Sequence, residues 1–314
     1  MGKLVLDGVV NSHEYYNGLQ YSASVDTDAV FQGFVSSCVA APHQCPLARS
    51  DSTNGSVTNE ILNFLEGLKN NSEVSEPQRS IYAPVKLLIT SNLKAPLKWP
   101  ILATALHQIL TGDSQAFKAT ASQLDEGSPI FPSNSNASEA QAAIECSDLT
   151  QRINDAQKIE QLSEAFEEQS FWGGGYGGLY LALCAHWRFT AKETYLGDFQ
   201  VRTKNPILFI GNTYDPITPL VSAQNMSTGF EGSVVLEQHS YGHTSLSQPS
   251  LCTAKVIQTY FQTGELPPKG KKCEPEFAPF KSNATFVDIF ANATELNKRA
   301  SRQTKMTEGR YLVL

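Results

Sequence analysis

The chain has 314 residues, of which 41% are hydrophobic and 18% charged, and its formal net charge is −7. This length and composition fit a globular protein with a full hydrophobic core and exclude a disordered chain. The acidic balance argues against nucleic acids and anionic membranes as partners, because phosphate binding needs a basic face. No stretch approaches the ~18 consecutive apolar residues of a transmembrane helix.

The first half of the chain is predicted to contain one short strand followed by helices. Residues 3–10 form an apolar run that ends in a turn at Asp7-Gly8, and this pattern predicts a buried strand. Apolar side chains then recur at helical spacing, and a polar loop is expected between residues 126 and 138. Helices are predicted over residues 13–45, 57–68, 81–89, 99–110 and 138–171.

A glycine-rich run follows at Trp172-Gly-Gly-Gly-Tyr-Gly-Gly178. Its composition is that of a phosphate-binding loop, but it lacks the Lys-Ser/Thr pair of such loops, and no strand is predicted before it. We therefore interpret the glycines as a flexible or tightly packed connection.

The last third of the chain alternates between strand and helix patterns. Strands are predicted at 206–210 and 233–237, and helices at 219–230 and 247–262; this order implies parallel strands joined by a crossover helix. The strand-forming parts thus lie at the two ends of the chain. We expect an α/β fold with a large helical unit inserted between strands, divided into a strand segment (1–12), a helical cap (13–195), a sheet domain (196–280) and a tail (281–314).

The cysteines and the glycosylation sequons indicate the cellular compartment in which the protein resides. The chain has 6 cysteines and no C-x-x-C pair, so metal ligation is poorly supported, whereas an even number fits disulfides in an oxidising compartment. Asn-x-Ser/Thr sequons favour a secreted glycoprotein; the alternative is free thiols and chance sequons. The sequons begin at Asn54, Asn70, Asn136, Asn225, Asn283 and Asn292.

The N-terminus does not read as a signal peptide. Only three apolar residues separate Lys3 from Asp7, whereas a signal peptide needs ~7–15. A secreted chain that opens in a strand is expected to lack its beginning.

An acid and a histidine follow the two predicted C-terminal strands. Functional residues of an open parallel sheet gather beyond the carboxyl ends of its strands, and neighbouring strands lie ~4.8 Å apart. We therefore expect Asp215 and His243 to come within hydrogen-bonding reach, where the carboxylate orients the imidazole and the imidazole takes a proton from a hydroxyl. The alternative is structural: an Asp-Pro turn often makes an Asx-turn, and a Gly-His pair can be an ordinary loop.

The segment from Pro206 to Cys273 resembles the C-terminal domain of the secreted tripeptidyl-aminopeptidase-like serine peptidases, relatives of prolyl aminopeptidase in the α/β-hydrolase superfamily. Residues 4–10 look like that family's strand after the nucleophile helix, and residues 99–113 look like a cap helix. The motifs that carry the resemblance are Pro206-Ile-Leu-Phe-Ile-Gly211, Asp215-Pro-Ile-Thr-Pro219, Gly242-His243, Ser250-x-Cys252, Gly264-x-Leu-Pro267 and Gly270-x-x-Cys273.

This resemblance implies the C-terminal portion of an α/β-hydrolase fold, with Asp215 and His243 as the acid and the histidine of a catalytic triad. It also implies a peptide substrate and no cofactor. In relatives that release N-terminal residues, acidic cap residues bind the free amine. The candidates here, each of which also reads as a solvated helix face, are Glu139, Glu145, Glu164, Glu167 and Glu168.

The chain departs from the family at the nucleophile. The family's serine sits in a G-x-S-x-G elbow, and this motif does not occur in the sequence. Ser240 and Ser245 flank His243 but lie on the wrong element, and an oxyanion loop is missing. Removing a triad serine costs on the order of 10⁶ in rate. We therefore expect the chain to be inactive alone.

Three functional interpretations follow. The first is a fragment of a secreted serine exopeptidase, the second a non-catalytic relative that binds ligands, and the third another α/β-hydrolase chemistry such as ester hydrolysis.

For the disulfides, local bridges between Cys38 and Cys45 and between Cys252 and Cys273 leave Cys146 with Cys184, although 6 cysteines allow ~15 pairings.

Overall fold

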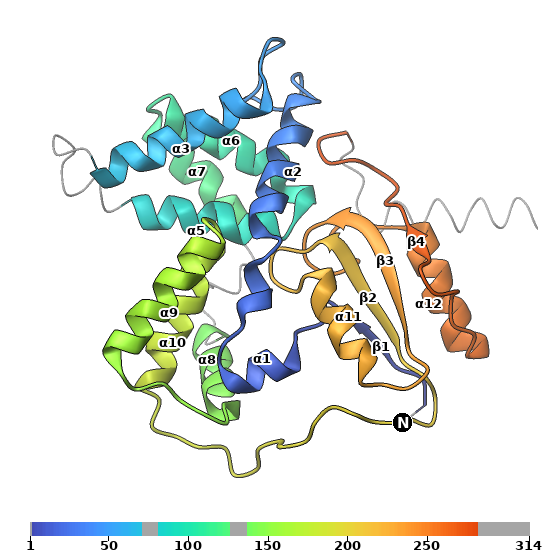
Figure 1. The fold of residues 1–314 in the computed structure, drawn as a ribbon. Helices are drawn as coiled ribbons and strands as arrows, with labels where there is room; N and C mark the ends of the chain where they lie inside the picture. Colours follow the sequence, from blue (N-terminus) through green and yellow to red (C-terminus); the bar gives the residue numbers. More distant parts are fainter. Residues whose placement is uncertain (1, 71–80, 126–136, 282–314) are drawn as a thin grey trace, which may run out of the picture.

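A parallel sheet with a helix against each face lies beside a large group of helices from the middle of the chain (Figure 1). The predicted loop at 126–138 lies largely outside the residues that the structure describes, and the predicted tail beyond residue 281 lies wholly outside them. The sequons at Asn136, Asn283 and Asn292 also lie outside them. The structure, a computed structural model, describes residues 2–70, 81–125 and 137–281.

Within the described residues the sheet is 4-stranded and parallel, in the order β1-β2-β3-β4. Its strands are β1 (Val5–Asp7), β2 (Leu208–Tyr214), β3 (Val234–Tyr241) and β4 (Lys272–Cys273). The helices that flank it are α11 (Leu220–Thr228) and α12 (Leu251–Thr263). The predicted β-α-β-α order and the α/β fold class are therefore confirmed. The sequence did not predict β4, because two residues carry no periodicity.

The central strand β2 is buried on both faces, which explains its continuous apolar sequence. Phe209 packs with Ala223 of α11 on one face, and Ile210 packs with Tyr260 of α12 on the other. Figure 1 shows α11 and α12 on opposite sides of the sheet. Each helix therefore covers one face of the sheet and buries a small core beneath it. The two cores hold the carboxyl ends of β2 and β3 in fixed positions relative to each other.

The helices of residues 12–185, which we call the helical unit, form the largest core. Phe31, Phe34 and Trp99 are almost fully buried at its centre. The expected helix over 13–45 is interrupted after Gly18, whose left-handed φ of 72° ends the first helix. The helices are α1 (Ser12–Asn17), α2 (Thr27–Val39), α3 (Asn54–Asn70), α5 (Tyr82–Leu93), α6 (Trp99–Leu110), α7 (Ser114–Asp125), α8 (Ala137–Asp148), α9 (Ala156–Gln169) and α10 (Gly174–Ala185).

The glycine-rich run corrects one expectation, because it begins helix α10 and is not a connecting loop. Its glycines let α10 lie close against α9. A Cβ at Gly174 would collide with the backbone of Phe166, and one at Gly178 would lie 2.7 Å from the Oγ of Ser163. Close helix packing explains this composition.

The structure contains three disulfides, and they are the expected ones. Cys38–Cys45 closes the end of α2, Cys146–Cys184 joins α8 to α10, and Cys252–Cys273 joins α12 to β4. Such bonds persist in oxidising compartments. In the described part of the chain, no helix has the length and apolar character needed to cross a bilayer.

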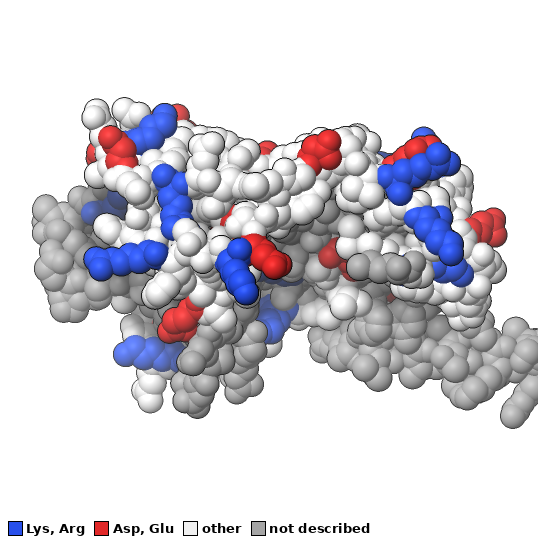
Figure 2. Space-filling view, turned by 90° about the horizontal axis from the view of Figure 1, so that it is seen from below, with Lys and Arg blue, Asp and Glu red and all other residues white. Residues whose placement is uncertain are grey.

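Charged side chains of both signs are intermixed on the face seen in Figure 2. Lys and Arg side chains stand singly or in small groups beside Asp and Glu, and neither sign dominates this face. The chain's excess of acidic residues is thus not concentrated here.

Candidate active site

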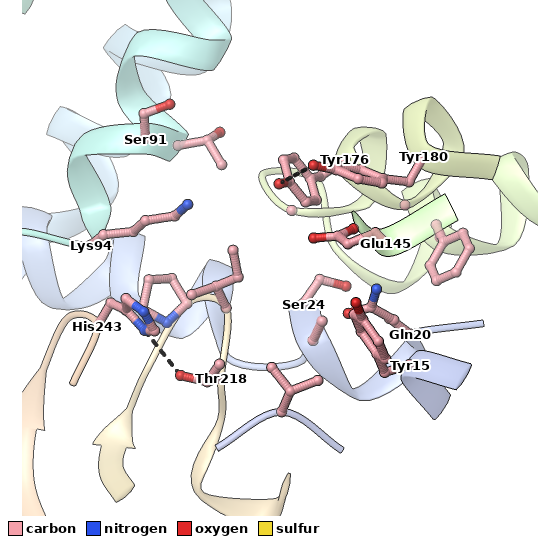
Figure 3. Close-up of a pocket in the computed structure, with 18 of the residues that line it drawn as sticks. Tyr15, Gln20, Ser24, Ser91, Lys94, Glu145, Tyr176, Tyr180, Thr218 and His243 are labelled. Atoms are coloured by element: carbon pink, nitrogen blue, oxygen red, sulfur yellow. Dashed lines mark hydrogen bonds between the residues drawn. The ribbon is translucent and has the colours of Figure 1, made fainter. Parts of the chain in front are cut away.

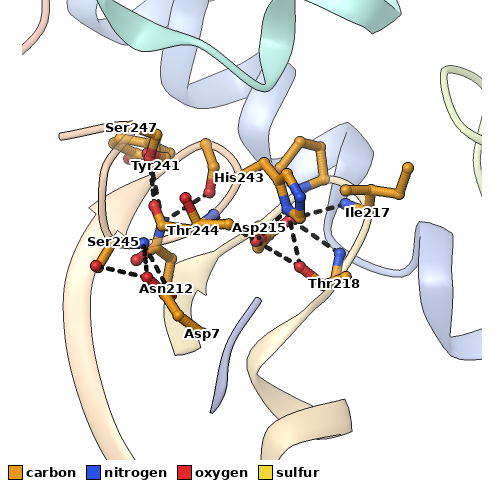
Figure 4. A network of polar contacts seen from close by, with 12 residues as sticks. Asp7, Asn212, Asp215, Ile217, Thr218, Tyr241, His243, Thr244, Ser245 and Ser247 are labelled. Atoms are coloured by element: carbon orange, nitrogen blue, oxygen red, sulfur yellow. Dashed lines mark hydrogen bonds and ion pairs between the residues drawn. The ribbon is translucent and has the colours of Figure 1, made fainter. Parts of the chain in front are cut away.

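The carboxyl ends of β2 and β3 bring the predicted acid and histidine together (Figure 4). Asp215 directly follows β2, His243 follows β3, and the Nδ1 of His243 lies 3.1 Å from the Oδ2 of Asp215. The Asp215 side chain is 0% exposed, whereas that of His243 is 38% exposed. The carboxylate is therefore shielded from water while the imidazole stays within reach of a substrate.

The loop after β2 holds the Asp215 carboxylate in place. Oδ1 accepts hydrogen bonds from the backbone N–H groups of Ile217 (3.0 Å) and Thr218 (2.9 Å). Oδ2 accepts from the Oγ1 of Thr218 (2.8 Å) and the backbone N–H of Thr244 (3.1 Å). These donors offset the cost of burying a carboxylate. The Asx-turn expected as an alternative is present, and it orients the carboxylate toward His243.

Thr218 is a member of this site that sequence reasoning missed. Its Oγ1 donates to Asp215 and lies 3.0 Å from the Nδ1 of His243. Two oxygens therefore face Nδ1, and this arrangement favours the tautomer with its proton on Nδ1. The Nε2 lone pair of a neutral His243 is then available to accept a proton. The available sequence signal was the short Asp-Pro-Ile-Thr spacing, which returns the hydroxyl to the carboxylate.

The helical unit fixes the His243 loop from the other side. The backbone N–H of His243 donates to the carbonyl of Lys94, just beyond α5, at 2.8 Å. Gly242 has a φ of 92°, and a Cβ there would lie 2.7 Å from the same Lys94 carbonyl. Only glycine both adopts this positive φ readily and leaves room for the Lys94 carbonyl. The close approach of the sheet to α5 therefore depends on this residue.

Ser240 and Ser245, the serines nearest to His243 in the sequence, are engaged elsewhere. The Oγ of Ser245 donates to Asp7 at 2.7 Å, and the Oγ of Ser240 accepts from Gln238 at 3.0 Å. Burial raises the pKa of the Asp7 carboxyl, although the bonds from Ser245 act in the opposite direction. Within the described residues, no side chain forms a hydrogen bond with the Nε2 of His243.

A cavity of about 290 Å³ opens beside His243 (Figure 3). We call it the His243 cavity. Thr218 and His243 line it from the sheet, whereas Lys94, Glu145 and Tyr176 line it from the helical unit. A volume near 300 Å³ lies at the small end of ligand pockets. The described residues contain no cluster of three metal-ligating side chains.

Glu145 is the one acidic cap candidate that lines this cavity; Glu139, Glu164, Glu167 and Glu168 are exposed elsewhere. Its Oε1 accepts a hydrogen bond from Gln141 at 2.8 Å, and Gln141 also donates to the hydroxyl of Tyr176 at 3.3 Å. Burial raises the pKa of the Glu145 carboxyl. The neighbouring Cys146–Cys184 disulfide fastens this part of α8 to α10.

Comparison with protein families supports a hydrolase relationship. Residues 170–273 match the model of an α/β-hydrolase family described as "TAP-like protein". The match includes Asp215, His243 and helix α10, and it covers about a third of the chain. Together with the parallel sheet, it supports a place in the α/β-hydrolase superfamily and a hydrolase-type function. A search of curated proteins gives no significant match.

Proposed function

We propose that Asp215 and His243 are the acid and the base of a secreted serine exopeptidase that releases short peptides from substrate N-termini. In this proposal, polypeptide outside these 314 residues supplies the nucleophilic serine, since the sequence has no G-x-S-x-G. The 3.1 Å contact between Asp215 and His243 at the His243 cavity is the observation that carries the proposal.

The geometry suits acyl transfer. The Nε2 of His243 takes the proton of the serine hydroxyl as the serine oxygen attacks the scissile carbonyl, and Asp215 stabilises the resulting imidazolium. His243 then gives this proton to the leaving amine as the peptide bond breaks. In the second half of the reaction, His243 deprotonates a water molecule that hydrolyses the acyl-enzyme, and the serine recovers its proton.

The edge of the sheet offers a place for the nucleophile. In the described structure, β1 pairs with β2 alone, so its other edge has unpaired backbone groups. Gly8, at the carboxyl end of β1, is close to the imidazole: a Cβ there would lie 3.1 Å from the Cε1 of His243. A strand that adds to this edge would place its own carboxyl end beside His243, where a nucleophile elbow belongs.

Glu145 is the proposed anchor for the substrate's free amine. It lines the cavity from the helical unit, which we propose acts as the cap, and it shares a hydrogen-bonded group with Gln141 and Tyr176. An ammonium ion is a suitable partner for a carboxylate held among tyrosines. This position would restrict cleavage to bonds near the N-terminus, because the amine and the scissile bond must fit one small cavity.

Secretion is the compartment that fits best. Three disulfides support it. The sequon residues Asn54 and Asn225 are exposed, as glycosylation requires.

A fluorophosphonate probe tests the proposal, because it reacts with activated serines. The native product is captured from its source with an antibody raised against recombinant 1–314. The native product is expected to be labelled, whereas the recombinant chain is not. A native product that has no reactive serine would contradict the proposal and favour the second candidate, a non-catalytic binding protein, which the missing G-x-S-x-G motif supports. Labelling together with cleavage of simple esters, but not of peptides, would favour an esterase.

A further inference from the structure

Lys94 brings a cationic side chain into the wall of the His243 cavity. It directly follows α5, and Figure 3 shows its ammonium group pointing into the cavity. Its backbone carbonyl is the group that holds the His243 N–H at 2.8 Å. The ammonium therefore lies at the end of the cavity where the proposed chemistry takes place.

Within the described residues, the Nζ of Lys94 has no hydrogen-bond or ion-pair partner. It lies 5.8 Å from the centre of the Tyr176 ring. Burial lowers the pKa of the ammonium, and the charge of Asp215 counteracts this effect. Asp215 does not pair with it directly, because its oxygens already accept from Thr218, Thr244 and the Ile217 backbone. Partly burying an ammonium whose three N–H donors have no acceptor costs free energy. A ligand that supplies acceptors would remove this cost.

Two hydroxyls of the same cavity also lack partners. The Oγ atoms of Ser24 and Ser91 are buried, and no hydrogen bond reaches them within the described structure. Ser91 lies in the last turn of α5, and Lys94 follows three residues later as the C-cap with helical backbone angles, so both side chains lie on one face. Proteins leave few buried polar groups unsatisfied. The Ser91 hydroxyl and the ammonium together form a polar surface that suits an anionic group of a ligand, whereas Figure 3 shows Ser24 nearer to Glu145 than to Lys94.

The anion and the cation of the cavity are separate. Glu145 comes from α8, accepts its hydrogen bond from Gln141 and does not pair with Lys94. Figure 3 shows Glu145 and Lys94 on different walls, with open space between them. An opposite-charge pair held apart in one small cavity is complementary to a ligand that carries both charges.

We propose that Lys94, assisted by Ser91, binds a carboxylate of the peptide whose amine is bound by Glu145, so that the cavity selects short peptides with both charges. The inference rests on the proposed function, which supplies the amine site. The carboxylate is either an acidic side chain or the free C-terminus of the bound peptide. Both present the same two oxygens to an ammonium and a hydroxyl.

Binding of four tripeptides to the full chain, measured by calorimetry, tests this inference. The peptides are free Ala-Ala-Ala, its C-terminal amide, its N-acetyl form, and the C-terminal amide of Ala-Ala-Glu. Loss of the carboxylate is expected to weaken binding about tenfold or more. Recovery with the glutamate peptide would assign the carboxylate to a side chain, and lack of recovery would assign it to the C-terminus.

Variants of Lys94 and Ser91 test whether these side chains cause the preference for a carboxylate. Lys94→Met is expected to remove the preference for the carboxylate, and Lys94→Arg to keep it. Ser91→Ala weakens the preference without removing the charge. The control is Lys255→Met, which removes an exposed lysine of α12 and leaves all four affinities unchanged. Circular dichroism checks that each variant is folded, and the peptide series on the unaltered chain remains decisive if Lys94→Met does not fold.

The outcomes separate the two proposals. Equal affinity of the unaltered chain for the acid and both amide peptides, with a retained preference for the free amine, would overturn the role of Lys94 alone. Loss of amine discrimination with a retained preference for the carboxylate would contradict the amine site and leave Lys94 as an anion site. Binding of none of the four peptides would overturn both. A Lys94→Met variant that loses stability but keeps its carboxylate preference would identify Lys94 as a counter-charge to Asp215 only.

Discussion

The Oγ1 of Thr218 lies 3.0 Å from the Nδ1 of His243, and the same hydroxyl donates to Asp215 at 2.8 Å. Thr218 thus ties the orientation of the imidazole to that of the carboxylate. We regard it as a positioning residue, because it acts through His243.

Replacement of this hydroxyl is expected to weaken the preference of His243 for the Nδ1–H tautomer. Thr218→Val keeps the shape and removes both bonds, at a cost of about 1 to 2 kcal/mol in the free energy of unfolding. Two-dimensional ¹⁵N NMR of the His243 ring measures the tautomer. Thr213→Val is the matched control, because its hydroxyl binds Glu237 on the sheet. An unchanged ring spectrum in Thr218→Val would contradict the positioning role.

Gly8→Ala is expected to destabilise the fold and to displace the side chains of Thr244 and His243. Gly8 has a φ of 69°, and a Cβ there would lie 2.8 Å from the Cγ2 of Thr244 and 3.1 Å from the Cε1 of His243. Backbone strain and the clash should together lower the free energy of unfolding by about 2 to 3 kcal/mol. Gly112→Ala separates the two effects, since Gly112 also has a positive φ but nothing lies within 4 Å of its Cβ position. The control should lose about 1 kcal/mol and leave the His243 resonances in place.

Asp26 gives the stability a specific pH dependence. Burial, with the nearby charge of Asp215, raises its pKa to about 6 from the usual aspartate value of 3.8. The folded chain therefore holds this proton between these two values while the unfolded chain loses it, so stability falls as pH rises through this window and levels off above about 6. Asp26→Asn removes this decline and loses no capping bond, because the Asp26 side chain makes no capping hydrogen bond at the start of α2.

After allowance for its partial exposure, we expect Asp26→Asn to be more stable than the unaltered chain at pH 7 by about 1 kcal/mol. Urea unfolding at pH 4 and pH 7 measures the difference. Asp51→Asn changes an exposed carboxyl and serves as the control. The same pH dependence in Asp26→Asn and in the unaltered chain would show that Asp26 is not the responsible group.

The Cys146–Cys184 disulfide is expected to affect both stability and the amine site. It spans 38 residues of sequence and is adjacent to Glu145; chain entropy predicts a loss of about 4 kcal/mol when both cysteines are replaced by serine. Peptide binding should also lose part of its preference for a free amine over an acetylated one. The Cys38–Cys45 bridge spans 7 residues, and its removal should cost about 2 kcal/mol without affecting that preference. Equal peptide selectivity in both double variants would remove Glu145 from the amine site.

The sequence was most informative where one physical signal dominates. Continuous apolar runs marked β2 and β3, and the strand order placed Asp215 and His243 at neighbouring strand ends. Helix α7 escaped prediction because large apolar residues are sparse in its sequence. The position of Lys94 beside His243 could not be predicted, since it depends on how the helical unit packs against the sheet. The same packing singles out Glu145 among five similar acids.

The most direct test of the account is labelling of the native gene product by a fluorophosphonate probe after substitution of its acid and its histidine. If Asp215 and His243 activate a serine, Asp215→Asn and His243→Ala should each slow labelling by about 10⁴-fold or more. An exposed histidine substitution, His239→Ala, should leave the rate unchanged. Labelling that proceeds at the original rate in both site variants would contradict the assignment of this pair as catalytic.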